Sequence, residues 1–80
     1  MKSVADRVRK LIADQFEVES VKDDAQIGWD LGADSLDAVE LLMAVEDEFD
    51  VQIEDAEVER ESMTVAEAIA LVESKMEPRR

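Results

Sequence analysis

Apolar residues recur at the spacing of an amphipathic helix in three separate stretches of the chain. The first stretch opens on Ser3, a good helix-capping residue, with Asp6 three places later. Its apolar stripe consists of Val4, Val8, Leu11, Ile12 and Phe16. The last stretch opens on Thr64 and Glu67, which have the spacing of a capping box. Its stripe consists of Val65, Ile69, Val72 and Met76.

The longest predicted helix runs from Ser35 to Phe49 and contains neither Gly nor Pro. Gly32 allows a sharp backbone bend before it, Asp34 is a strong capping residue, and Asp37 places an acid in the first turn. At about 100° per residue, five apolar side chains fall within about one third of the circumference of this helix, and we expect them to face the core. These are Ala38, Leu41, Leu42, Val45 and Phe49.

The opposite side of this helix carries an apolar spot among acidic residues. Leu36 and Met43 lie nearly opposite the core face, Val39 lies toward one edge, and Glu40 and Asp47 share their side. A docking face combines apolar contact with charges that orient the partner. Single apolar residues are also common on ordinary protein surfaces, but the position of these beside a serine favours docking.

The two connections between these helices have no helical period. Residues 17–33 read as a long, ordered loop with five apolar anchors, namely Val18, Val21, Ile27, Trp29 and Leu31. We expect Trp29 to pack within this loop. In residues 50–63, positions 55–60 predict a short helix that leans on its neighbours, and Met63 is expected in the core.

The predicted fold is therefore all-α, a small four-helix bundle with three longer helices, one short helix and a long first loop. Residues 1–80 make one domain, with an ordered part from about residue 3 to residue 76. The predicted core consists of Val8, Leu11, Ile12, Leu41, Leu42, Val45, Phe49, Ile69 and Val72.

Composition narrows the possible functions. The 80 residues carry a net charge of −13 and include neither Cys nor His, so a disulfide framework, thiolate metal site or histidine base is absent. The charge disfavours nucleic acid and anionic membranes as partners. No Lys or Arg occurs between Asp23 and Glu59, so the middle of the chain should attract a basic partner. Neither a signal peptide nor a membrane span is evident, and we expect a cytoplasmic monomer.

One segment resembles a known protein family. Residues 30–37 read Asp-Leu-Gly-Ala-Asp-Ser-Leu-Asp, and Glu-Asp-Glu-Phe stands at 46–49. Together with the helical pattern from Val4 to about Met76, these residues resemble acyl carrier proteins. The resemblance implies that a separate phosphopantetheinyl transferase attaches 4′-phosphopantetheine from coenzyme A to Ser35. The arm then holds acyl chains as thioesters and presents them to the enzymes of fatty acid synthesis. The resemblance implies that the protein itself is not an enzyme.

The resemblance also implies a partner-binding face and an acyl pocket. Positions that meet basic patches on partner enzymes in that family correspond here to Asp34, Leu36, Asp37, Glu40, Met43, Glu46 and Asp47. Leu42, Val45 and Ile53 are candidates for lining an acyl pocket between the long middle helix and the short helix predicted after it. The sequence departs from the family at Trp29, at Glu54 and just before Thr64.

Three other interpretations remain open on the residues alone. A specialised carrier for one polyketide, lipid or secondary-metabolite pathway would share every feature above. An acidic adaptor would use the same face without a modified serine. A calcium-binding module is disfavoured, because the Asp-x-Asp-x-Asp-Gly loop of such modules does not occur, although the crowded carboxylates suit weak divalent-ion binding.

Overall fold

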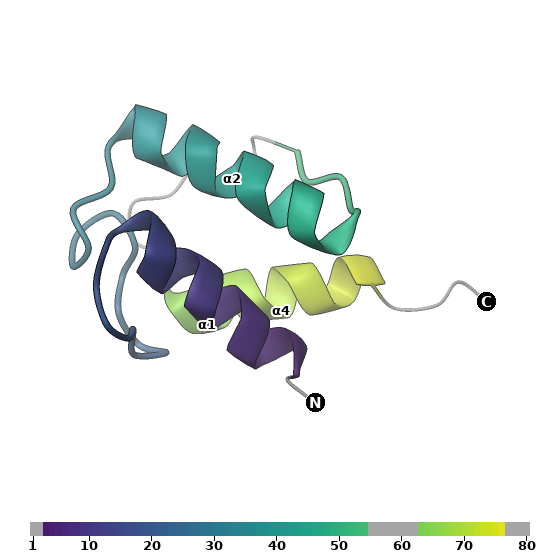
Figure 1. The fold of residues 1–80 in the computed structure, drawn as a ribbon, viewed down its shortest axis with the longest axis horizontal. Helices are drawn as coiled ribbons and strands as arrows, with labels where there is room; N and C mark the ends of the chain where they lie inside the picture. Colours follow the sequence, from purple (N-terminus) through teal and green to yellow (C-terminus); the bar gives the residue numbers. More distant parts are fainter. Residues whose placement is uncertain (1–2, 55–62, 77–80) are drawn as a thin grey trace.

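The computed structural model describes residues 3–54 and 63–76, and every regular element in these ranges is a helix (Figure 1). Helix α1 spans Val4–Gln15, α2 spans Ser35–Phe49 and α4 spans Val65–Met76. The all-α prediction and its three longer helices are confirmed. The short helix predicted at 55–60 lies outside the described residues. None of the helices described is long and apolar enough to span a membrane.

Each helix begins at the residue that the sequence predicted. The Ser3 side chain accepts a hydrogen bond from the Asp6 backbone N–H at 3.1 Å at the start of α1. At α4 the Thr64 hydroxyl accepts from the Glu67 N–H at 3.1 Å, and the Glu67 carboxylate accepts from the Thr64 N–H at 2.9 Å. These side chains satisfy backbone donors that a helix start leaves without intrahelical partners.

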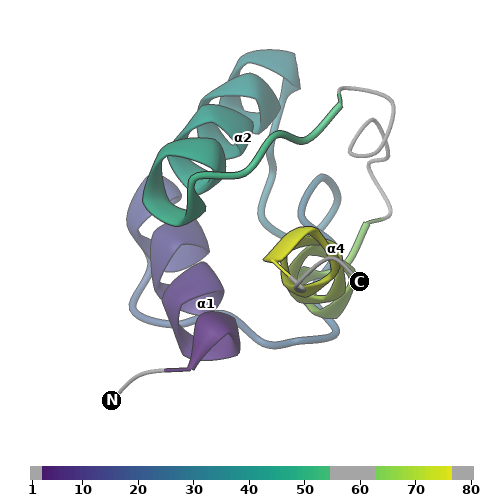
Figure 2. The same ribbon diagram turned by 90° about the vertical axis from the view of Figure 1, so that its right-hand side faces the viewer.

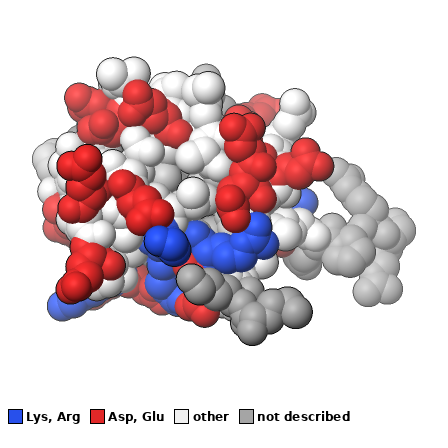
Figure 3. All heavy atoms as spheres, in the orientation of Figure 1, with Lys and Arg blue, Asp and Glu red and all other residues white. Residues whose placement is uncertain are grey.

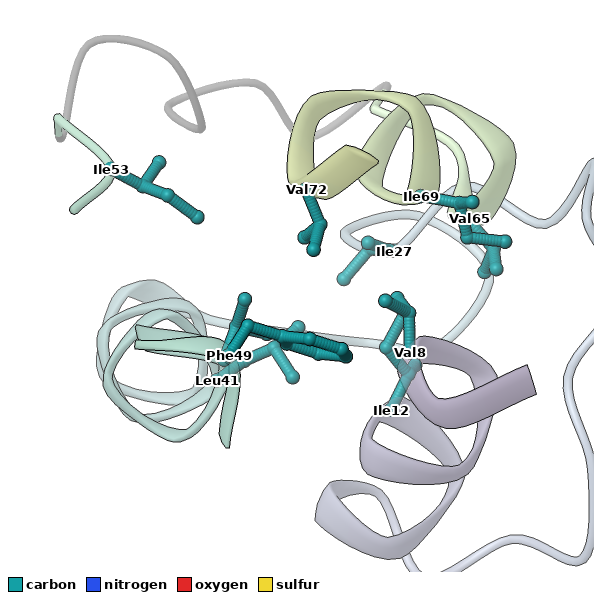
Figure 4. Packing of buried hydrophobic residues seen from close by; sticks show 10 residues of the cluster. Val8, Ile12, Ile27, Leu41, Phe49, Ile53, Val65, Ile69 and Val72 are labelled. Carbon is teal, nitrogen blue, oxygen red and sulfur yellow. The ribbon is translucent and has the colours of Figure 1, made fainter. Parts of the chain in front are cut away.

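The three helices meet around one apolar core (Figure 4). Most of the predicted core residues are buried, whereas Leu11 and Leu42 are only partly buried and pack against its edge. Three residues from the connections are buried as well, namely Ile27, Ile53 and Met63. Met63 is 6% exposed, which confirms its predicted place inside.

Helix α1 is the central packing partner of the bundle. It packs extensively against both α2 and α4, while α2 and α4 touch each other much less (Figure 2). The Arg7 guanidinium crosses from α1 to the end of α2, where it donates to the Glu48 carboxylate at 2.8 Å and to the Glu48 carbonyl at 3.3 Å. The same guanidinium lies 4.5 Å from the centre of the Phe49 ring, within cation–π range.

The long loop is ordered because it pairs with the segment that leads into α4. Gln26 and Thr64 form an isolated antiparallel bridge. The Ile27 N–H donates to the Met63 carbonyl at 2.8 Å, and the Val65 N–H donates to the Ala25 carbonyl at 2.9 Å. The loop thus pairs with the segment before α4 through an isolated β-bridge and its flanking hydrogen bonds. The sequence pattern did not predict this pairing.

The prediction that Trp29 packs within the loop is wrong. Its side chain is 67% exposed, whereas Ile27, two places earlier, is buried and supplies the apolar anchor. Val21 and Leu31 are partly buried against the core, and Val18 is 42% exposed. Three of the five predicted anchors therefore hold the loop, and the largest of the five points outward.

The loop is also tied to α1 by an ion pair. The Arg9 Nε donates to Asp23 at 2.7 Å and its Nη2 donates to the other carboxylate oxygen at 3.0 Å, while Nη1 reaches Asp6 at 2.9 Å. The hydrogen bonds from Arg9 lower the pKa of Asp23 below its ordinary value of 3.8. The same hydrogen bonds raise the pKa of Arg9.

This ion pair predicts a specific acid dependence of stability. A carboxylate whose pKa is lowered in the folded state stabilises the fold above its unfolded pKa, and this contribution is lost as the pH falls through the folded value. We expect the contribution of Asp23 to be fully present above about pH 5 and to decline as the pH falls past its ordinary pKa of 3.8 toward the lower pKa of the folded state. Urea unfolding between pH 7 and pH 3 should therefore show the parent more stable than Asp23→Asn at neutral pH, with the difference shrinking toward acid. A difference that stays constant over this range would contradict the role given to Arg9.

Candidate functional site

Ser35 is the first residue of α2 and follows a tight turn of the backbone. Gly32 has a φ of 75°, in the left-handed region that residues with a side chain rarely adopt. The Ala33 N–H then donates to the Ile27 carbonyl at 3.3 Å, which closes the turn against the buried part of the loop. On either side of Ser35, Asp34 and Leu36 are exposed, so the start of α2 lies at the surface.

Asp34 and Asp37 form a reciprocal capping box around the start of α2. The Asp34 carboxylate accepts from the Asp37 N–H at 2.9 Å, and the Asp37 carboxylate accepts from the Asp34 N–H at 3.3 Å. The two acids also complement the positive end of the helix dipole. Both were predicted to meet a partner, and the structure gives each a local role in fixing the backbone at Ser35.

The outer face of α2 has the apolar spot that the periodicity indicated. Leu36 is 65% exposed, Met43 is 59% exposed and Val39 is 50% exposed. Glu40 and Asp47 are exposed beside them. Acidic side chains spread over the upper half of the molecule, where α2 lies, while Lys and Arg gather in the lower half over α1 (Figure 3). The structure thus brings apolar surface and negative charge together on the helix that begins at Ser35.

Two predicted partner-binding acids make contacts inside the molecule. Glu40 accepts a hydrogen bond from the Gln15 side-chain amide of α1 at 3.1 Å. Glu46 is partly buried, and its carboxylate accepts from the Ile53 N–H at 2.9 Å. Glu46 therefore ties the segment after α2 to the helix and holds the backbone beside the buried Ile53 side chain. Sequence reasoning missed this role, because a carboxylate that reaches a backbone donor seven residues away has no local motif.

The cations of α1 are engaged with acids of α1 itself, of the long loop and of the end of α2. Arg7 pairs with Glu48, Arg9 pairs with Asp6 and Asp23, and Lys10 pairs with Asp14 at 3.3 Å. Among the carboxylates of α2, only that of Glu48 forms one of these ion pairs. The residues described contain no group of three or more acids, Cys or His arranged to hold a metal ion, so they give the calcium-module interpretation no support.

Comparison with known proteins identifies the class to which this fold and site belong. Residues 6–72 match the family model described as the phosphopantetheine attachment site. Acyl carrier proteins from Buchnera aphidicola subsp. Acyrthosiphon pisum, strains 5A and Tuc7, are each 43% identical over 77 residues, covering 94% of this chain and 95% of the relative. The chain belongs to the acyl carrier protein family. It is a carrier of acyl groups, not an enzyme, its cofactor is phosphopantetheine, and a role in fatty acid synthesis is consistent with this membership.

The hydrogen bond from Ile53 to Glu46 predicts a destabilised variant. Glu46→Ala leaves a partly buried N–H without its acceptor, and we expect a loss of about 1–3 kcal/mol in the free energy of unfolding. The Ile53 amide should also exchange with solvent faster, as measured by hydrogen exchange with NMR detection. The matched control is Asp47→Ala, which removes an exposed carboxylate and should change the free energy by less than about 0.5 kcal/mol. Equal behaviour of the two variants would contradict the role of Glu46.

The crowded acids predict a fold that salt stabilises. Raising the ionic strength from about 10 mM to about 0.5 M shortens the Debye length from about 30 Å to a few Å, which weakens repulsion among the carboxylates. We expect the melting temperature to rise by about 5 °C or more, with millimolar magnesium acting in the same direction. Asp47→Asn removes one of these charges, so salt should raise the melting temperature of this variant by less than that of the parent. A melting temperature that changes with neither salt nor magnesium would exclude repulsion among the carboxylates as a cost to the fold.

Proposed function

We propose that Ser35 carries the phosphopantetheine arm. The observation that supports this most directly is its position as the first residue of a capped helix, between two exposed residues, at the edge of an acidic face. An arm attached there extends into solvent and remains free to move. Since the chain has no His, it offers no histidine base beside the serine, and a separate phosphopantetheinyl transferase supplies the catalysis.

The phosphodiester forms when the Ser35 hydroxyl oxygen bonds to the phosphorus next to the pantetheine of coenzyme A. The bond from that phosphorus to the adenosine bisphosphate breaks, and the transferase removes the serine proton. The helix start contributes a favourable dipole, while Asp34 and Asp37 repel the new phosphodiester and direct it away from the helix. When bound, the arm supplies a terminal thiol that holds an acyl group as a thioester.

The outer face of α2 is the surface that we propose for partner enzymes. The exposed side chains Leu36 and Met43 supply apolar contact, and Glu40 and Asp47 supply charge that steers a basic surface toward the arm. Asp34 and Asp37 add charge while they hold the helix start. Glu46 contributes less to docking than the sequence suggested, because its side chain is only partly exposed and its carboxylate binds the Ile53 backbone.

The acyl chain is proposed to enter between α2 and the segment 51–54. Val45 and Ile53 are buried in the core and Leu42 packs against it, so all three predicted lining residues belong to the apolar interior or its edge. Among the described helices, α2 and α4 contact each other less than either contacts α1, so separating these two breaks the fewest direct helix–helix contacts. This placement supports a pocket that accepts cargo by separating helices.

We further infer that residues 1–80 act as one cytoplasmic, monomeric carrier domain that binds neither nucleic acid nor membranes. Service to fatty acid synthesis is the role best supported by the relatives, which are acyl carrier proteins. A specialised carrier for a polyketide, lipid or secondary-metabolite pathway is the second candidate, favoured by the exposed Trp29. Purified fatty acid synthesis enzymes separate the two, since a specialised carrier should fail to be loaded with malonyl or elongated.

Attachment at Ser35 predicts a single, site-specific change of mass. Incubation with coenzyme A and a broad-specificity phosphopantetheinyl transferase should add one phosphopantetheine to the parent, and none to Ser35→Ala, in intact-mass spectra. The matched control is Ser20→Ala, which removes an exposed loop serine and should be modified like the parent. Modification of Ser35→Ala would place the arm elsewhere, and a folded parent that remains unmodified would favour the unmodified adaptor.

A further inference from the structure

Trp29 is the most exposed of the large apolar side chains that the structure describes. It is 67% exposed and is the only Trp in the chain, which contains no Tyr. Its neighbours Ile27 and Leu31 turn toward the core, so the indole does not contribute to the packing that orders the loop. With about two thirds of its surface in water, the indole buries little apolar area in the fold, and exposed aromatic side chains are enriched at contact sites.

The backbone around Trp29 is held by closely spaced hydrogen bonds. The Asp30 carboxylate accepts from the Gln26 N–H at 2.7 Å, and the Asp30 N–H donates to the Gln26 carbonyl at 2.7 Å. The bridge between Gln26 and Thr64 fixes the base of this turn to the start of α4. Trp29 is therefore presented by a pre-organised turn, so a partner that binds it loses little of its energy to ordering the loop.

The turn also places Trp29 near the proposed attachment residue. The hydrogen bond of 3.3 Å from Ala33 to Ile27 brings these two residues together. Trp29 is two residues beyond Ile27, and Ser35 is two residues beyond Ala33, so their Cα atoms lie within about 20 Å of each other. The turn and the start of α2 lie at the same end of the molecule (Figure 1). A protein that reaches Ser35 therefore comes within range of the indole.

The charge around the turn indicates the kind of partner. Asp24 and Asp30 are exposed on either side of Trp29 in the sequence, and no Lys or Arg occurs from position 23 to position 59. An arginine satisfies both features, because its guanidinium stacks on an indole ring and pairs with carboxylates. Two other occupants are disfavoured by charge repulsion. A second copy of this chain carries a net charge of −13, and the arm carries an anionic phosphodiester, so the acids of the turn repel both.

We propose that Trp29 is a second anchor for the basic proteins that act at Ser35, receiving an arginine side chain that stacks on its indole next to Asp30. This inference rests on the proposed function and deepens it, because it extends the partner surface from the outer face of α2 to the turn 26–33. The phosphopantetheinyl transferase is the partner on which the anchor acts first.

The test measures transfer of phosphopantetheine to the full unmodified chain. Trp29→Ala should raise the KM for the chain about 10-fold, with kcat little changed, because a hot-spot tryptophan contributes to binding and lies outside the reacting atoms. Trp29→Phe should recover part of the loss. The matched control is Val18→Ala, which trims another exposed loop residue and should leave KM unchanged. All variants should have the melting temperature of the parent, because the Trp29 and Val18 side chains are both exposed.

A second measurement observes the indole itself. Labelling with 5-fluorotryptophan gives one fluorine resonance, since Trp29 is the only Trp, and this signal should shift when transferase is added without coenzyme A. An unchanged KM for Trp29→Ala together with an unmoved resonance would overturn the proposal. A resonance that moves with chain concentration alone, or on attachment of the arm alone, would assign Trp29 to a second copy or to the arm and would also overturn it. Failure of the parent to be modified would contradict the attachment at Ser35, while a shift on adding transferase would still support the anchor.

Discussion

The antiparallel pairing of the long loop with the entry to α4 is the contact on which the rest of the structure depends. The N–H groups of Ile27 and Val65 donate across it, and the Ala66 N–H extends the pairing by donating to the Asp23 carbonyl at 2.8 Å. Asp23 in turn binds Arg9 of α1 through its side chain. One short segment thus joins the first helix, the loop and the last helix, and it fixes the point from which the chain turns into α2.

Negative charge on α2 serves the proposed docking at some cost to the fold. Arg7, Arg9 and Lys10 form their ion pairs with Glu48 and with acids of α1 and the loop, so these cations leave the middle of α2 negative. Exposed ion pairs contribute little to stability, typically about 0–1 kcal/mol each. The apolar core and the helix caps therefore carry most of the stability, and the acids remain available to steer a basic protein.

The parts of the structure that the sequence predicted are those with a local physical signal. Helix starts follow from Ser3, Asp34 and Thr64, because capping needs a particular side chain within three residues of its donor. The core follows from helical periodicity, and Leu11 and Leu42 fall short of full burial because they lie at the edge of their stripes. The serine and the outer face of α2 were likewise evident, since both belong to one continuous helix.

The contacts that the sequence could not predict all join residues far apart in the chain or depend on the direction of one side chain. Trp29 is a large apolar residue of the kind that usually packs in a core. The turn closed by Asp30 instead directs Ile27 inward and leaves Trp29 exposed. The contact between Arg7 and Glu48 joins residues 41 positions apart, and no periodicity encodes such a pair. The short helix expected at 55–60 lies outside the described residues and stays a prediction.

The contact between Glu46 and Ile53 links the two halves of the proposed function. Asp50 ends α2 in the left-handed region with a φ of 54°, so the chain turns sharply and the next segment runs back along the helix. That segment is held by the buried Ile53 side chain and by a hydrogen bond to an acid on the helix that partners would meet. A partner cation that pairs with Glu46 competes with the Ile53 N–H for the same carboxylate. Since α2 and α4 contact each other less than either contacts α1, the proposed separation of helices breaks few direct contacts between these two, and the hydrogen bond from Ile53 is one of the contacts that hold the segment 51–54 to α2.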